Sequence, residues 1–130
     1  MEIKSILANM ANGMIHYVNR AEPISTVEWT PHPKFKGVCL KHIIKGKDTN
    51  GLFSAHLVRI DPHCCLDTHC HENQLELHKI IEGHGSCQLV ENQFEVHLGK
   101  MTLIPKGQNH KVQAGEKGLA LLAEFFPALL

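Results

Sequence analysis

Short apolar segments, separated by glycine, proline and polar turn residues, run along most of this 130-residue chain. Segments of this length between turn formers are typical of β-strands. We expect strands at residues 38–45, 52–60, 75–81, 85–90, 93–98, 100–104, 111–114 and 119–126. Short strands at regular spacing, with turn signals between them, predict an all-β sandwich or barrel within one domain.

The first part of the chain follows a different pattern. Residues 4–12 allow one short helix, and the three prolines within residues 23–36 favour an irregular arm. We expect Trp29 and Phe35 of this arm to pack on the barrel or on a second subunit. The expected division is an N-terminal arm at residues 1–36 and a barrel at residues 37–130.

Charge and cysteine content argue against several classes of protein. The 13 basic and 13 acidic residues balance, whereas a nucleic-acid surface would need clustered lysine and arginine. No segment is long and apolar enough to span a bilayer, and the N-terminus lacks the pattern of a signal peptide, so we expect no membrane partner and a cytoplasmic location. Five cysteines, an odd count, fit a reducing compartment better than a disulfide framework. A zinc site formed by Cys64, Cys65 and Cys70 is disfavoured, because no CxxC pair occurs.

The pair His69 and His71 begins the strongest chemical signal in the chain. On an extended strand, residues two apart point to the same face, so both imidazoles would lie together. A polar turn at residues 72–74 would let the next strand return with Glu76 beside them, and His110 would arrive from a distant strand. Three imidazoles and one carboxylate suit a divalent transition metal, with positions left open for a substrate or water.

The spacing around these residues resembles the two sequence motifs of the cupin superfamily. The resemblance covers about residues 50–127 and is specific when both motifs are taken together. The chain departs from the motifs at the opening glycine, at an Asp and at an Asn, where His63, Lys100 and Ala114 stand. The matching positions are His69, His71, Glu76 and Gly83 in the first motif, and Gly99, Pro105, Gly107 and His110 in the second.

This resemblance implies an all-β fold, the cupin-type double-stranded β-helix or jelly-roll barrel. It implies one divalent transition metal, Fe, Mn, Ni or Zn, held by His69, His71, Glu76 and His110. The implied function is a metalloenzyme of the dioxygenase, isomerase, epimerase or lyase type that acts on a small polar molecule. The alternative is a non-catalytic barrel that binds or senses a small ligand such as a sugar. Small cupins are often homodimers, so we expect a homodimer that buries part of the apolar run 119–130.

Alternatives stay open for the neighbouring residues. His78 lies two after Glu76 and should share its inward face, where it would be a general acid–base, a hydrogen-bonding support for the site, or a packed histidine. We select His78 as the candidate catalytic residue. Strand alternation turns Cys70 to the opposite face, so we expect it to have no part in catalysis. The orientation of His56 is not readable from its segment, which has polar residues on both faces.

Overall fold

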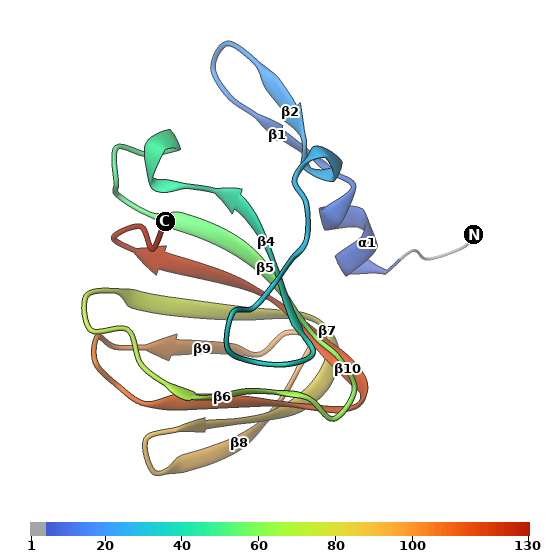
Figure 1. Cartoon of the computed structure of the whole chain (residues 1–130), viewed down its shortest axis with the longest axis vertical. Coiled ribbons are helices and arrows are strands. Elements are labelled where there is room, and N and C mark those ends of the chain that lie inside the picture. The colour runs from blue at the N-terminus through green and yellow to red at the C-terminus, as the bar shows by residue number, and fades with distance from the viewer. Residues whose placement is uncertain (1–4) are drawn as a thin grey trace.

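Residues 5–130, the part of the chain that this computed structural model describes, form ten strands, one α-helix and two short 3₁₀ helices (Figure 1). The helix α1 spans Ile6–Ala11, and the 3₁₀ helices span Ile24–Thr26 and Gly46–Asp48. Lys4, where the predicted helix began, lies outside the described residues. The strands are β1 (Met14–His16), β2 (Ala21–Pro23), β3 (Thr30–Pro31), β4 (Val38–Ile44), β5 (Ser54–Ile60), β6 (Cys65–His69), β7 (Leu75–Leu89), β8 (Asn92–His97), β9 (Met101–Ile104) and β10 (His110–Phe126).

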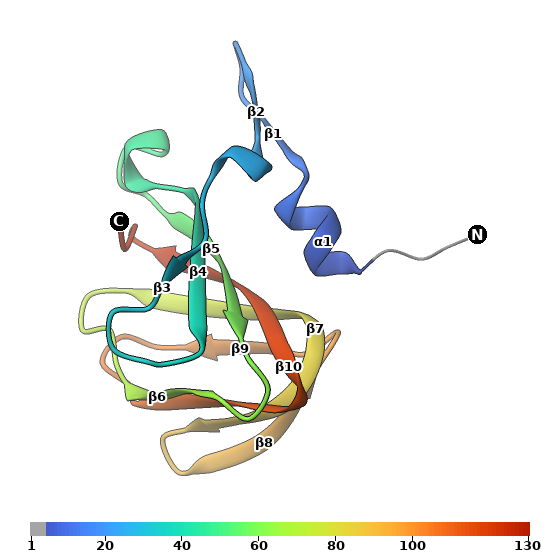
Figure 2. The same cartoon turned by 45° about the vertical axis from the view of Figure 1, so that its right-hand side comes forward.

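Two long, bent strands, β7 and β10, run through the barrel and pair with different strands in their two halves. The C-terminal half of β10 lies between β5 and the first half of β7. Its N-terminal half pairs with β6 and with the second half of β7. The eight strands β3 to β10 form one sheet in the order β3-β4-β5-β10-β7-β8, with β6 on β10 and β9 on β7, and Figure 2 shows this sheet curling round into a barrel. The strands β1 and β2 pair with each other in a separate hairpin. The predicted all-β jelly-roll barrel is confirmed, and it places the start of β10 beside the end of β6.

In two places the structure has one strand where the sequence predicted two. The strands predicted at 75–81 and 85–90 are both part of β7, and those predicted at 111–114 and 119–126 are both part of β10. Gly83 and Gly118 have φ angles of 79° and 81°, and a side chain on Gly83 would collide with the Gly118 carbonyl oxygen. These glycines therefore let two paired strands bend together at close approach, and they do not end the strands.

Side chains alternate between the inside and the outside of the barrel, and both faces of its central strands are buried. Val58 and Leu121 belong to the inner core, whereas their sequence neighbours Leu57 and Ala120 belong to an outer cluster. This alternation is the period of two expected for strands. Helix α1 covers the outer cluster with Leu7, Met10 and Ala11.

The irregular segment after β2 also packs on the barrel of its own chain. Trp29 lies over the outer cluster, with its ring centroid 4.6 Å from the guanidinium carbon of Arg59 and 5.5 Å from Nζ of Lys41. Phe35 packs against the inner core, and its ring centroid is 5.8 Å from that of His69. The division at residue 36 and any packing on a second subunit stay predictions. No described helix has the length and apolar character needed to cross a membrane.

Candidate metal centre

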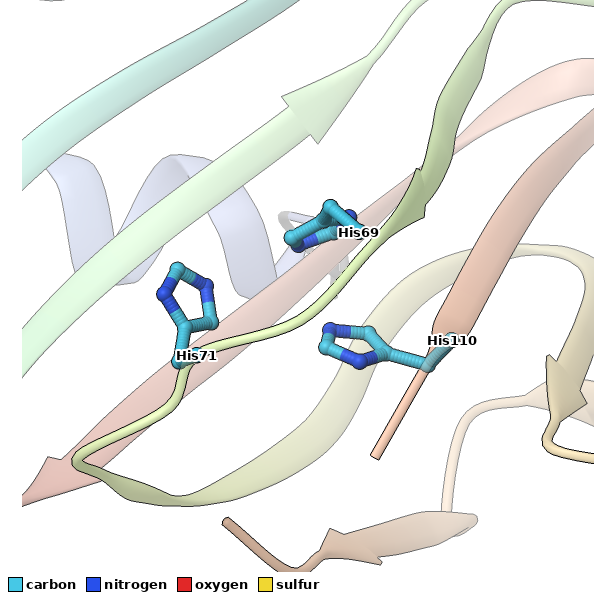
Figure 3. Close-up of side chains that lie close together, drawn as sticks. All are labelled: His69, His71 and His110. Carbon is cyan, nitrogen blue, oxygen red and sulfur yellow. The ribbon is translucent and has the colours of Figure 1, made fainter. Parts of the chain in front are cut away.

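The four predicted ligands come from separate segments and meet inside the barrel. His69 ends β6, Glu76 lies on β7, and His110 begins β10, where its backbone pairs with that of His69. His71 was expected on the same strand as His69, but β6 ends before it and His71 lies in the following loop. Figure 3 shows the three imidazole rings turned toward one another. The ring centroid of His69 is 5.2 Å from that of His71 and 4.2 Å from that of His110.

A backbone hydrogen bond joins the loops that carry the two halves of this cluster. The amide of Gly107 donates to the carbonyl oxygen of His71 at 2.9 Å. Gly107 has a φ of 73°, which glycine adopts without strain, so the turn before His110 can approach the His71 loop closely. The hydrogen bond from Gly107 therefore fixes the loop that carries His71, and the His71 ring stays beside His69 although no strand supports it.

The nitrogen and oxygen atoms that face one another form two groups compact enough for a metal ion, one of His69, His71 and His110 and one of Glu76, His78 and His110. One ligand atom from each of His69, His71 and His110 lies within 4.8 Å of the others. Oε1 of Glu76 is 3.1 Å from Nε2 of His110 and 4.0 Å from Nε2 of His71. Two atoms bound to one ion at about 2.1 Å lie at most about 4.2 Å apart, so both distances fit a shared ion.

Two of these atoms are buried without a hydrogen-bond partner among the described residues. Oε1 of Glu76 and Nε2 of His110 lie 3.1 Å apart, yet their geometry is not that of a hydrogen bond. An unpaired buried polar atom costs free energy, so such a pair needs an explanation. A cation between the carboxylate and the imidazole nitrogens would supply it, and the donor set of three nitrogens and one oxygen suits a divalent transition metal.

Hydrogen bonds on the far side of two rings fix the tautomer that a metal ligand needs. Nδ1 of His69 lies 2.7 Å from the carbonyl oxygen of Asp67, and Nδ1 of His110 lies 3.1 Å from that of Gln108. A carbonyl oxygen only accepts, so each Nδ1 carries the proton and donates it. In the neutral ring, Nε2 then keeps its lone pair directed into the cluster.

The charges of the cluster also suit a divalent cation. Burial lowers the pKa of His69 to about 4 and lowers that of His71, so both rings are neutral near pH 7. Burial alone would raise the pKa of Glu76, but the charge of His78 and its hydrogen bond to the carboxylate outweigh burial and hold the pKa well below its usual range. The cluster therefore offers the neutral imidazoles of His69 and His71 and an ionised carboxylate, the protonation states in which these groups bind metals.

His78 lies next to the cluster and contacts its carboxylate. Its Nε2 is 2.7 Å from Oε2 of Glu76, the oxygen opposite the one that faces His110, and the residue is 2% exposed. Cys70 is directed elsewhere, with its thiol donating to Oε1 of Glu72 at 3.3 Å. The groups of possible metal ligands found among residues 5–130 contain no cysteine, and the five cysteines are all free.

A cavity of about 80 Å³ lies in front of the cluster. This space holds several waters or one small organic molecule. Within the described part of the chain, no lysine or arginine lines the cavity, and Glu76 is its one carboxylate. The other lining residues are His32, Leu40, His42, His56, Val58, Leu66, His69, His71, His78, Ala123, Phe125 and Leu129.

Three of these lining histidines were not identified as site residues from the sequence. His32 comes from the arm, and its Nδ1 accepts the backbone amides of Lys34 and Phe35, so in the neutral ring Nε2 carries the proton. Val38 and Leu40 of β4 pack in the inner core, and His42 follows them at the same spacing of two. This period of two indicates that the His42 side chain also points inward. No local signal exists for His32, because only the tertiary fold brings the arm over the cavity.

Comparison with known proteins places the chain among ligand-binding barrels. A family profile described as the AraC-like ligand binding domain matches residues 54–123. No curated protein matches the chain.

Solved structures resemble the chain in fold. A predicted oxalate decarboxylase from Thermotoga maritima is 18% identical, with a TM-score of 0.72 over 79% of this chain and 95% of that one. KdgF from Halomonas sp. is also 18% identical, with a TM-score of 0.69 over 79% and 88%. Oxalate decarboxylase from Bacillus subtilis, described with Mn(II) centres, is 20% identical with a TM-score of 0.69, over 82% of this chain but only 29% of that one. At these identities the likeness establishes a shared fold.

Proposed function

The chain belongs to the AraC-like ligand-binding domain family and has the cupin fold, and on this premise we propose that it is a metal-dependent enzyme acting on a small polar molecule inside the barrel. The observation that carries the proposal is the buried, unpaired contact between Oε1 of Glu76 and Nε2 of His110. With His69 and His71, these residues would hold one Fe, Mn, Ni or Zn ion. Such an ion supplies Lewis acidity toward a carbonyl or carboxylate oxygen of the substrate.

The protein's own residues would do three things around that ion. The carbonyl-anchored rings of His69 and His110 keep their Nε2 atoms fixed in direction. Glu76 balances part of the positive charge, and His78 holds the carboxylate by its second oxygen. The apolar walls limit the water that reaches the substrate.

The acid–base role of His78 is part of the proposal. His78 lines the cavity as well as contacting Glu76, so it can exchange a proton with that carboxylate and lies within reach of a bound molecule. An oxygenase, an isomerase or epimerase, and a lyase would all use a metal with an acid–base group of this kind.

A second candidate function is reversible binding of a small ligand without turnover. The observation that favours it is the match of the AraC-like ligand-binding profile to residues 54–123. The two functions differ in one measurement. Metal-loaded protein that retains a small acid or sugar unchanged, with no oxygen uptake and no isomerised product, would be a binding protein.

Elemental analysis of the purified protein tests the metal site. We expect one equivalent of divalent metal per chain, and its loss at neutral pH in His71→Ala and His110→Ala. His97→Ala is the matched control, because His97 is an exposed histidine at the end of β8, away from the cavity lining. A full equivalent in both ligand variants would overturn the assignment.

A further inference from the structure

A second group of polar residues lies in the same cavity, apart from the candidate metal ligands. Nδ1 of His42 is 2.8 Å from Nδ1 of His56, and Nε2 of His56 is 2.8 Å from Oγ of Ser54. The backbone amide of Leu129 donates to the same Oγ at 2.9 Å. Ser54 is fully buried and His56 is 2% exposed, whereas His42 is partly exposed. The three side chains form one continuous chain of hydrogen bonds.

The strand register places this chain of hydrogen bonds across the cavity wall. His42 pairs with His56, His56 pairs with Ala123, and Ala123 pairs with His78 on its other side. The ring of Phe125 stands between the two groups, with its centroid 5.5 Å from that of His56 and 5.0 Å from that of His71. A small molecule that contacts the metal ligands at one end can lie along Phe125 and reach the His42 pair with its other end.

The geometry between the two imidazoles allows one proton. Two Nδ1 atoms at 2.8 Å would repel each other with no proton between them, and two protons would collide, so one ring donates and the other accepts. Ser54 already accepts the Leu129 amide, and its hydroxyl can either donate to His56 or accept from it.

This proton count leaves two arrangements of the whole chain. In the first, Ser54 donates to Nε2 of His56, His56 donates to His42, and Nε2 of His42 carries a proton. In the second, His42 donates to His56, His56 donates to Ser54, and Nε2 of His42 is an acceptor. Both arrangements hold the same number of protons and are neutral, so His42 can present either a donor or an acceptor without a net charge in the barrel.

We propose that Ser54, His56 and His42 form a neutral hydrogen-bond relay that ends at His42 and gives the cavity a second polar contact, for a hydroxyl or carbonyl oxygen of a small molecule bound at its other end to the metal. The first arrangement donates to a carbonyl oxygen, and the second accepts from a hydroxyl. The absence of lysine and arginine from the described lining leaves the histidines to contact such an oxygen. Burial lowers the pKa of His42, and burial followed by the charge of His42 lowers that of His56 to about 4, which keeps the relay neutral near pH 7. Only the position of the far end of the ligand rests on the proposed function.

The relay is tested first in metal-free protein by NMR of the imidazole nitrogens. We expect one of the two Nδ1 atoms to carry a slowly exchanging proton, and that signal to disappear in both His42→Leu and His56→Leu. Ser54→Ala should change the tautomer balance of His56 while the protein stays folded. Protons on both Nδ1 atoms, or on neither, would overturn the relay. This measurement needs no metal, so it stands even if the proposed metal site fails.

The ligand contact is tested with metal-loaded protein and matched probes. The probes are 3-hydroxypropionate and 4-hydroxybutyrate, each compared by calorimetry with the same acid lacking the hydroxyl. We expect the wild-type protein to bind one hydroxy acid about fivefold more tightly than its partner, the worth of one neutral hydrogen bond. His42→Leu should lose this preference at unchanged metal content, and the surface control His97→Leu should keep it. Equal affinities in the wild type, no binding of any probe, a preference that survives in His42→Leu, or loss of metal from that variant would each overturn the contact.

Discussion

Replacing His78 with leucine removes the hydrogen-bond donor of a buried carboxylate at similar side-chain volume. His78 and Glu76 are 2% and 3% exposed, and Nε2 lies 2.7 Å from Oε2 of the carboxylate. A hydrogen bond to a charged group contributes about 1.5–3 kcal/mol, and loss of a residue that orients a metal ligand lowers metal affinity by about 10- to 100-fold. These two estimates agree, since about 1.4 kcal/mol corresponds to a factor of ten.

The pH dependence of metal binding separates this role from simple packing. Without His78, burial would raise the pKa of Glu76, so protons would compete with the metal at a higher pH than in the wild type. We therefore expect His78→Leu to show both weaker binding at pH 7.5 and a steeper loss of affinity as the pH falls. His78→Gln is the control, because its amide keeps a donor near the carboxylate, and it should stay within a few-fold of the wild type.

Competition against a chromophoric chelator, repeated at several pH values, measures both quantities. Metal affinity in His78→Leu within twofold of the wild type would refute the reasoning. An equal loss in His78→Leu and His78→Gln would also refute it, because it would show that the volume of the imidazole matters and its N–H does not.

Three further results are expected. Metal-free protein should lose up to about 3 kcal/mol of unfolding free energy as the pH falls from 6.5 to 4. The reason is that His56, with its pKa lowered to about 4 in the folded protein, takes up a proton more readily in the unfolded chain. Urea unfolding that shows the same pH dependence in His56→Leu would contradict this. Lys41→Ala should lower the unfolding free energy by about 2 kcal/mol in the same assay, because the Nζ of buried Lys41 donates to the Ala11 carbonyl at 3.1 Å and lies over the Trp29 ring. Lys47 is exposed, so Lys47→Ala is the control and should leave the unfolding free energy unchanged. The chain should be a homodimer that uses part of β10 and the arm around Trp29, and light scattering that gives the mass of one chain at micromolar concentration would exclude it.

The fold class and the candidate ligands were readable from local spacing. The periods of turn residues and apolar segments are properties of neighbouring positions, so they predicted an all-β barrel correctly. The interval between His69 and His71, and the glycine and proline positions before His110, were enough to name residues that the structure brings together. The prediction that His78 shares a face with Glu76 followed from the same period of two, and the structure shows the two side chains in contact.

Tertiary structure decided what depends on segments far apart in the sequence. A glycine such as Gly83 has the same local signal in a turn and in a bend, and only the close approach of Gly118 makes it a bend within β7. His32 reaches the cavity because the arm returns over the barrel, and His42 meets His56 because β4 pairs with β5 in one register. Register and arm packing are set by the burial of whole faces, which no short stretch of sequence contains. The sequence therefore predicted which residues meet at the candidate metal site, and the packing of distant strands determined the cavity and the second group of histidines that faces it.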